Sequence, residues 1–241
     1  MPELPEAEVA ARQLRERVVG ATVRDCWIGR GDIVREGLPS LDQYRQAKIA
    51  GVERKGKSVI LHFLCGKEPR FLVAELGMTG LLLFRSTLTK HPQHTHFILH
   101  LDGCCEPDIR YWNPRRFGRL SLLDRAGLDR YVARRFGHDP LTISHEKFLR
   151  VLRATRSRLK SLLMHQQVIA GIGNIYANEI LFRSRLHPNQ PSNSIPGKSI
   201  TRLHQVMGEV LREAIAMGGS SVRGYFAPDG PEGQYKRRHL V

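Results

Sequence analysis

The chain has 241 residues, of which 41% are apolar, and this is enough for one large domain or two small ones with a real core. No apolar run is long enough to span a bilayer and no signal peptide begins the chain, so we expect a soluble, intracellular protein. Lys and Arg number 38 against 23 Asp and Glu, and the net charge of +15 favours a polyanionic partner, most often nucleic acid, over a merely soluble basic surface.

The first half of the chain reads as one helix followed by strands. Pro5 suits a first helical turn, Glu6 and Glu8 suit its positive end, and Gly20 can end it. From 22 to 123, apolar residues alternate or form short blocks between turn residues, as in TVRDCWIG, KSVILHFL, RFLVAEL and THFILHL. This pattern predicts an antiparallel sandwich or barrel with a flanking helix.

After FGHDPL at 136–141 the apolar spacing becomes helical, in SHEKFLRVLR, SRLKSLLMHQ, GNIYANEILFRSRL and SITRLHQVMGEVLREAIAMGG. Ser199 or Thr201 can cap the last helix, and Gly218 with Gly219 can end it. The sequence therefore predicts an α+β protein with a β-rich domain at 1–135, a hinge near 136–141 and a helical domain at 136–241. A polyanion could lie in the groove between them.

The four cysteines, Cys26, Cys65, Cys104 and Cys105, form no C-x-x-C pair. A cysteine zinc site is therefore not expected. We expect all four to be reduced thiols in a reducing compartment.

Residues 51–58 read GVERKGKS and fit the phosphate-loop pattern G-x-x-x-x-G-K-[ST]. A phosphate loop must open a helix, so that the helix amides face the phosphates. Here the apolar, β-branched VILHFL follows, which is typical of a strand, and no clear strand precedes Gly51. A nucleotide-hydrolysing protein is therefore a distant alternative, and Lys57 is free for another role.

The second residue is proline, and methionine before proline is normally removed. The new terminus is a secondary amine, and an α-amino group titrates near about 8 against about 10.4 for lysine, so more of it is neutral at pH 7. A neutral amine can attack the anomeric carbon of a sugar and form an iminium ion. Glu3 can donate or accept a proton during ring opening. The competing interpretation is that Pro2 and Glu3 merely begin a helix.

Eight blocks resemble, in order, those of the formamidopyrimidine-DNA glycosylases, bacterial repair enzymes for oxidised purines: MPELPEAEV, RKGKSVIL, LGMTG, HTH, NPRRFG, DPL, LKSLLMHQQVIAGIGNIYANEILF and GGSSVRGYF. The start PELPE favours this family over the sister Nei enzymes, whose start usually reads PEGPE. The resemblance implies that Pro2 is the Schiff-base nucleophile and Glu3 the acid that assists ring opening. It implies that Glu6 supports the site and that Lys57 serves phosphate binding and β-elimination.

The resemblance also implies a set of DNA contacts. Met78, Arg115 and Phe117 would fill the gap left when the damaged base is flipped out, through an apolar wedge, a stacked ring and a guanidinium that pairs with the orphaned base. For Met78 and Phe117, ordinary core packing is the competing interpretation. The remaining implied contacts are His94 on a phosphate, Asn174 and Lys160 around a helix–two-turn–helix, the weaker candidate Arg156, and Ser221, Val222, Arg223 and Tyr225 on a mobile loop.

Three features depart from the family. Glu75 stands where many relatives carry His or Arg, and a carboxylate there would repel phosphate unless it is paired. His165 replaces a usual acid. YKRRHLV ends the chain where relatives continue into a four-cysteine zinc finger that grips DNA and supplies an arginine tied to δ-elimination. No metal or other cofactor is expected, and a truncated copy and a natural zincless form both stay open.

The family resemblance, together with the chemistry of Pro2 and Glu3, implies a bifunctional DNA glycosylase and AP lyase of base excision repair. Such an enzyme excises 8-oxoguanine and formamidopyrimidines and cleaves the abasic site through an imine. The expected partner is damaged double-stranded DNA, the expected state a monomer, and the expected place the bacterial cytoplasm or nucleoid. One alternative is a Nei-like enzyme for oxidised pyrimidines. Another is a non-enzymatic binder of damaged or abasic DNA.

Overall fold

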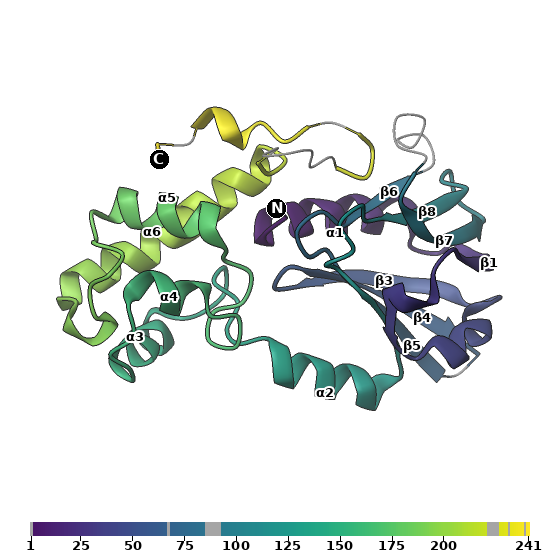
Figure 1. The fold of residues 1–241 in the computed structure, drawn as a ribbon, viewed down its shortest axis with the longest axis horizontal. Helices are drawn as coiled ribbons and strands as arrows, with labels where there is room; N and C mark the ends of the chain where they lie inside the picture. Colours follow the sequence, from purple (N-terminus) through teal and green to yellow (C-terminus); the bar gives the residue numbers. More distant parts are fainter. Residues whose placement is uncertain (1, 67, 85–92, 221–226, 231, 239) are drawn as a thin grey trace.

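The computed structural model describes residues 2–66, 68–84, 93–220, 227–230, 232–238 and 240–241. One lobe holds the strands and the other holds four of the helices, with the beginning of the chain between the two lobes (Figure 1). The expected α+β class is confirmed. No helix among the described residues has the length and apolar character needed to cross a membrane.

The helices are α1 (Leu4–Val18), α2 (Arg125–Arg135), α3 (His145–Arg153), α4 (Leu159–Met164), α5 (Asn174–Ser184) and α6 (Gly197–Ala216). The strands are β1 (Thr22–Ile28), β2 (Val34–Glu36), β3 (Lys48–Lys55), β4 (Ser58–Cys65), β5 (Glu68–Glu75), β6 (Leu81–Phe84), β7 (Thr95–Asp102), β8 (Asp108–Trp112) and β9 (Leu120–Leu123). Short 3-10 turns are η1 (Gly31–Ile33), η2 (Leu38–Tyr44), η4 (Ser192–Ser194) and η5 (Tyr235–Arg238).

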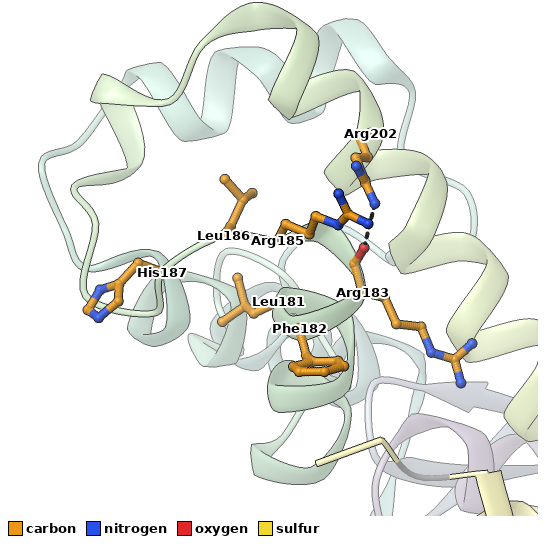
Figure 2. A pocket seen from close by; sticks show the side chains of 7 residues that line it. All are labelled: Leu181, Phe182, Arg183, Arg185, Leu186, His187 and Arg202. Carbon is orange, nitrogen blue, oxygen red and sulfur yellow. Dashed lines mark hydrogen bonds between the residues drawn. The ribbon is translucent and has the colours of Figure 1, made fainter.

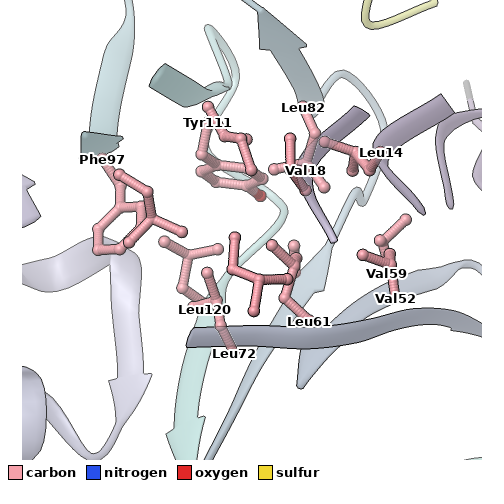
Figure 3. Close-up of a cluster of buried hydrophobic side chains, with 14 of the residues drawn as sticks. Leu14, Val18, Val52, Val59, Leu61, Leu72, Leu82, Phe97, Tyr111 and Leu120 are labelled. Carbon is pink, nitrogen blue, oxygen red and sulfur yellow. The ribbon is translucent and has the colours of Figure 1, made fainter. Parts of the chain in front are cut away.

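The strands form a sheet in the order β2-β9-β5-β4-β3-β1-β7-β8-β6, in which neighbours are antiparallel except for the parallel pair β2–β9. β1 pairs with β3 only at Thr22 and Lys48, whereas it pairs with β7 along its length. The sheet therefore divides into two layers at this join, as the predicted sandwich requires. Apolar side chains from both layers fill the space between them, including Leu61 and Leu72 from one layer and Phe97 from the other (Figure 3).

The segment GVERKGKS is a β-hairpin and not a phosphate loop. Gly51 lies inside β3, and β4 begins at Ser58 with Lys55 and Ser58 as the last pair before the turn. Gly56 takes a φ of +55° in this turn, a left-handed conformation that glycine adopts without strain. No helix follows whose amides could cradle phosphates, and the tip of the hairpin instead presents Lys57.

The helical lobe has its own core, which is built from α3 to α6 and the turns between them. Leu4 and Val9 belong to this core, although most other buried residues of α1 pack against the sheet. The first helix is therefore shared by both lobes, and its beginning is fixed against the helical one. In particular, the N–H of Leu4 donates to the carbonyl of Gly171 at 2.9 Å.

Two details of the helices differ from expectation. Helix α2 was not predicted. It is capped by Asp124, whose side chain accepts from the N–H of Gly127. The predicted cap of α6 is wrong, because the helix begins at Gly197, directly after Pro196, with no side-chain cap. Thr201 lies one turn inside α6 and donates to the carbonyl of Gly197.

Candidate active site and DNA-binding face

The carboxylate of Glu3 is completely buried and lies on the first turn of α5. It accepts hydrogen bonds from the backbone N–H of Gly173 at 2.6 Å and of Ile175 at 3.0 Å. Unpaired amides and the helix dipole make such a helix start a site for an anion. Here a side chain from the other end of the sequence occupies that site, so the fold places residue 3 with precision.

Gly173 brings Lys57 to the same point. A Cβ on residue 173 would lie 2.4 Å from the carboxyl carbon of Glu3 and 2.6 Å from the Nζ of Lys57. Both groups therefore occupy the space where any other side chain would begin. The hairpin tip of β3–β4, the start of α1 and the start of α5 converge here. They bring together Glu3 and Lys57, to which the family resemblance assigned separate roles.

Glu6 organises the back of this site. One carboxylate oxygen accepts from the N–H of Glu3 at 2.8 Å, and the other accepts from the hydroxyl of Tyr176 and the N–H of Ser220, both at 2.6 Å. The supporting role predicted for Glu6 thus has a geometric basis. Sequence reasoning missed Tyr176 and Ser220, and the tyrosine in GNIYANE was the available signal. Burial, with the charge of Glu6 as the next cause, raises the pKa of Tyr176 well above its ordinary value, so its hydroxyl stays a donor.

Burial opposes both charges at the centre of the site. It raises the pKa of Glu3, while the nearby charge of Lys57 lowers it. It lowers the pKa of Lys57, while Glu3 and then Glu6 raise it. The carboxyl group thus keeps its proton to a higher pH than usual, and the amine loses its proton at a lower one. Such a pair is suited to proton transfer.

Pro2 is buried directly before Glu3, which is the N-cap residue of α1. This position sets residue 2 beside the Glu3–Lys57 pair. Its nitrogen is an amine only when Met1 has been removed. Residue 2 would then carry a secondary amine directly before Glu3, whose pKa is raised.

The predicted wedge residues lie on two adjacent loops. Met78 is 37% exposed and Phe117 is 56% exposed, so neither is a core residue. A Cβ on Gly77 would lie 2.5 Å from the N of Gly118, which shows how closely the two loops approach. The guanidinium of Arg115 lies over the ring of Phe117, 5.0 Å from its centroid. All three side chains therefore belong to one surface.

Asn113, which sequence reasoning did not single out, holds these loops. It is fully buried, and its Oδ1 accepts from the hydroxyl of Thr79 and the N–H of Arg116. Its own N–H donates to the carbonyl of His94 at 3.0 Å. His94 is exposed and has a φ of +72°, so the chain turns sharply there and presents the histidine beside the wedge loops.

The expected helix–two-turn–helix consists of α4, a turn and α5. Asn174 is the first residue of α5 and is exposed, but the neighbouring amides of Gly173 and Ile175 bind Glu3 and are not free for a phosphate. Lys160 lies half-buried in α4 and Arg156 is exposed before it. None of the contacts in the described part of the chain joins Lys160 or Arg156 to the Glu3–Lys57 pair. The loop candidates lie outside the described residues: Ser221, Val222, Arg223 and Tyr225.

Glu75 is paired, which answers the concern that the sequence raised. Its Oε1 lies 3.1 Å from Arg135 and 3.6 Å from Arg35, and it accepts from the hydroxyl of Tyr131 at 2.8 Å. The other departure, His165, ends α4 and is exposed. A carboxylate held between two guanidinium groups contributes little negative potential to the surrounding surface.

Two cavities border these elements differently. One of about 340 Å³ lies between the lobes and is lined by Lys57, Gly77 and Gln166 among others. Another of about 660 Å³ lies at the far end of α5, around Phe182 and Arg185 (Figure 2). The helix has 11 residues, so its two ends are about 16 Å apart and the second cavity is remote from Glu3. Over the described residues, no group of three or more His, Cys, Asp or Glu could hold a metal ion.

Known proteins resemble the whole chain. Residues 1–120 match the formamidopyrimidine-DNA glycosylase N-terminal domain and residues 136–225 match the formamidopyrimidine-DNA glycosylase H2TH domain. The formamidopyrimidine-DNA glycosylases of Thermus thermophilus and Solibacter usitatus are 38% and 36% identical to it, over 100% of this chain and 86% and 87% of theirs.

Solved structures agree with these matches. The crystal structure of the Thermus thermophilus MutM (Fpg) protein has a TM-score of 0.85 at 36% identity and covers 100% of this chain and 86% of that one. The complex of Lactococcus lactis Fpg with DNA containing an abasic site has a TM-score of 0.86 at 28% identity and covers 98% and 86%. The chain belongs to the formamidopyrimidine-DNA glycosylase family.

Proposed function

We propose that this protein is a DNA glycosylase of base excision repair that removes oxidised purines, such as 8-oxoguanine and formamidopyrimidines, and then cleaves the abasic site. One observation carries the proposal. In this member of the family, Glu3 and Lys57 meet around Gly173 at the start of α5, and Glu3 directly follows Pro2 in the sequence.

The chemistry follows from the groups present. The neutral nitrogen of Pro2 attacks C1′ of the damaged nucleotide and a C–N bond forms. The bond from C1′ to the base breaks, and the base leaves with that electron pair and with the proton that the Pro2 nitrogen gives up. Glu3, with its raised pKa, donates a proton to the ring oxygen as the sugar opens to an iminium ion. Loss of the C2′ proton and breakage of the C3′–O bond then cut the strand. Lys57, with its lowered pKa, is placed near this step.

The surface beside the site supports a flipped base. Exposed Met78 and Phe117 can fill the space that the base leaves, and Arg115 can bond the orphaned partner. The names of the relatives refer to formamidopyrimidine lesions, and one of the similar structures contains a formamidopyrimidine in DNA. We carry this substrate class over to the chain, and with it damaged duplex DNA as the partner.

The finer proposals concern the protein as a whole. The reaction needs no metal or organic cofactor, because the amine, the acid and the lysine supply each step. We further propose a monomer that works in the bacterial cytoplasm or nucleoid. All the relatives named above are bacterial proteins.

Borohydride trapping on an abasic-site duplex tests the proposal, with Met1 removed from the protein. We expect a covalent adduct with the wild type. Pro2→Gly should still bind DNA but lose most base excision, because a primary amine replaces the constrained secondary one. Binding without an adduct would instead identify a non-enzymatic binder. A parallel excision assay compares 8-oxoguanine with an oxidised pyrimidine. A preference for the pyrimidine would favour Nei-like specificity and contradict the proposed substrate.

A further inference from the structure

A cationic groove continues from the candidate active site along α2. The cavity of about 340 Å³ between the lobes and a neighbouring one of about 780 Å³ share Tyr131, Arg134, Arg135 and Gln167. We call the two together the hinge groove. It begins at Lys57 and Gly77 on the sheet lobe and extends along α2, the helix that connects the lobes (Figure 1).

The groove carries more positive than negative charge. The 780 Å³ part is lined by four arginines, Arg35, Arg130, Arg134 and Arg135, and by one acid, Glu36. Glu75 in the smaller part is matched by ion pairs with Arg35 and Arg135. Arg130 and Arg134 are exposed and make no ion pair within the part of the chain that the structure describes. They are four residues apart on α2, so their side chains lie on the same face, one turn apart.

We propose that the hinge groove binds the phosphodiester backbone of the DNA beside the lesion, with Arg130 and Arg134 as its phosphate contacts. The proposal rests on the proposed function and extends it to two arginines of α2, Arg130 and Arg134, which lie outside the sequence blocks that carry the family resemblance. Guanidinium groups suit phosphate oxygens because their fixed fork of N–H donors matches them.

The position of the groove favours DNA over a small anion. Lys57 lines the groove and also lies beside Glu3 at the start of α5. Gly77, which also lines the groove, directly precedes the wedge residue Met78 in the sequence. A strand whose lesion reaches Lys57, and whose stack is filled by Met78, therefore has its backbone at the mouth of the groove. The two arginines in line along one helix can then contact neighbouring phosphates of one strand.

The test is the salt dependence of binding by the full chain. The double variant Arg130→Gln/Arg134→Gln is compared with Arg24→Gln/Arg150→Gln, which removes the same charge from exposed arginines of β1 and α3. The probe is a duplex that contains a tetrahydrofuran abasic analogue, which cannot form an imine. Its dissociation constant is measured between 50 and 200 mM salt.

We expect the groove variant to lower the slope of log affinity against log salt by about 1.8, since each phosphate contact contributes about 0.9. The dissociation constant at low salt should rise at least about tenfold. The control variant should follow the wild type, and Arg130→Lys/Arg134→Lys should restore most of the slope because the charge returns. A groove variant whose slope equals that of the control would overturn the proposal, provided that both melt like the wild type.

The outcome separates this proposal from the proposed function. A trapped adduct together with an unchanged slope would support the proposed glycosylase and contradict DNA binding by the hinge groove. A slope that depends on Arg130 and Arg134, in a protein that forms no adduct, would support DNA binding by the hinge groove and contradict the proposed glycosylase and lyase chemistry.

Discussion

Glu3 is a buried carboxyl group whose pKa is set by its burial, by two charged neighbours and by two backbone hydrogen bonds. Burial raises its pKa most, Lys57 opposes this, and Glu6 adds to it. Because the folded pKa lies above the unfolded one, the stability that protonation contributes is fully present below the unfolded pKa and is lost as pH rises through the folded pKa. The raised pKa that suits Glu3 to donate a proton therefore costs the protein stability at pH values above that folded pKa.

Replacing Lys57 with methionine should raise the pKa of Glu3 further, because the opposing positive charge disappears. The limb of the pH–rate profile that Glu3→Gln abolishes should therefore move to higher pH in Lys57→Met. The measurement is single-turnover excision as a function of pH. Lys55→Met, at an exposed neighbour in the same hairpin, is the control and should not move the limb. An unmoved limb in Lys57→Met would contradict the electrostatic coupling.

The wedge residues should matter for base flipping far more than for folding. Met78→Ala and Phe117→Ala remove partly exposed side chains, so each should cost less than about 1 kcal/mol of stability. Excision of a paired lesion should fall strongly, because flipping costs a few kcal/mol of stacking and pairing that the wedge offsets. The same lesion opposite an abasic gap should be excised almost normally.

Phe182→Ala is the matched control for these two variants, since Phe182 is 55% exposed and lies at the end of α5 that is remote from Glu3. It should leave both assays unchanged. Equal losses on paired and unpaired lesions, or a large drop in thermal stability, would show that Met78 and Phe117 act as structural residues.

At the level of elements, the sequence predicts the helices and strands whose own residues show a clear apolar periodicity. The alternation of apolar residues was sufficient to predict the strands, and the apolar stripes were sufficient to predict α3, α5 and α6. The strand-like VILHFL after Lys57 was enough to reject a phosphate loop. Helix α2 was missed because only Gly127, Leu128 and Tyr131 of its 11 residues are buried, which leaves no apolar period to read. Pro196 fixes where α6 begins, and this outweighed the capping preference of Ser199 or Thr201.

The contacts between elements could not be predicted in the same way. Gly173 and Glu3 are 170 residues apart, and only the docking of α1 against α5 makes the helix amides a site for that carboxylate. The family resemblance indicated the roles of Pro2, Glu3 and Lys57. It gave no physical reason why the turn before α5 must carry glycine, and the structure supplies that reason.

Gly173→Ala should therefore abolish base excision while DNA binding persists. The new Cβ would overlap the carboxyl group of Glu3 and the Nζ of Lys57, so both must leave their places. Gly197→Ala, at the start of α6 where nothing lies within 4 Å of the added carbon, is the control and should retain activity. The measurements are single-turnover excision and the affinity for an abasic-analogue duplex. Normal excision by Gly173→Ala would contradict the proposed assembly.

At the level of the whole molecule, contacts from several elements hold the two lobes in register, among them the hydrogen bonds of Glu3 with α5 and of Glu6 with Tyr176. Arg54 on β3, only 7% exposed at its side chain, pairs with Glu8 of α1 and with Asp139 in the hinge. The returning segment 227–230 pairs with the sheet lobe where the N–H of Phe84 donates to the carbonyl of Pro228. Lys57 of the sheet lobe meets Glu3 at the start of α5 in the helical lobe, so these contacts also fix the distance between Lys57 and α5.

The last prediction concerns Arg54. Arg54→Met leaves two carboxylates, Glu8 and Asp139, partly buried without their shared cation, and breaking a buried pair in this way costs about 3–5 kcal/mol. Arg12 is the other partner of Glu8, and its side chain is 54% exposed. Arg12→Met should therefore cost about 0–1 kcal/mol. Urea denaturation of both variants gives the comparison. The double variant Arg54→Met/Asp139→Asn should recover part of the loss, because one of the orphaned charges is then gone. If Arg54→Met costs no more than Arg12→Met, the ion pairs of Arg54 are not what holds the lobes together, and the register of Lys57 with α5 comes from the other contacts between the lobes, such as the packing of α1.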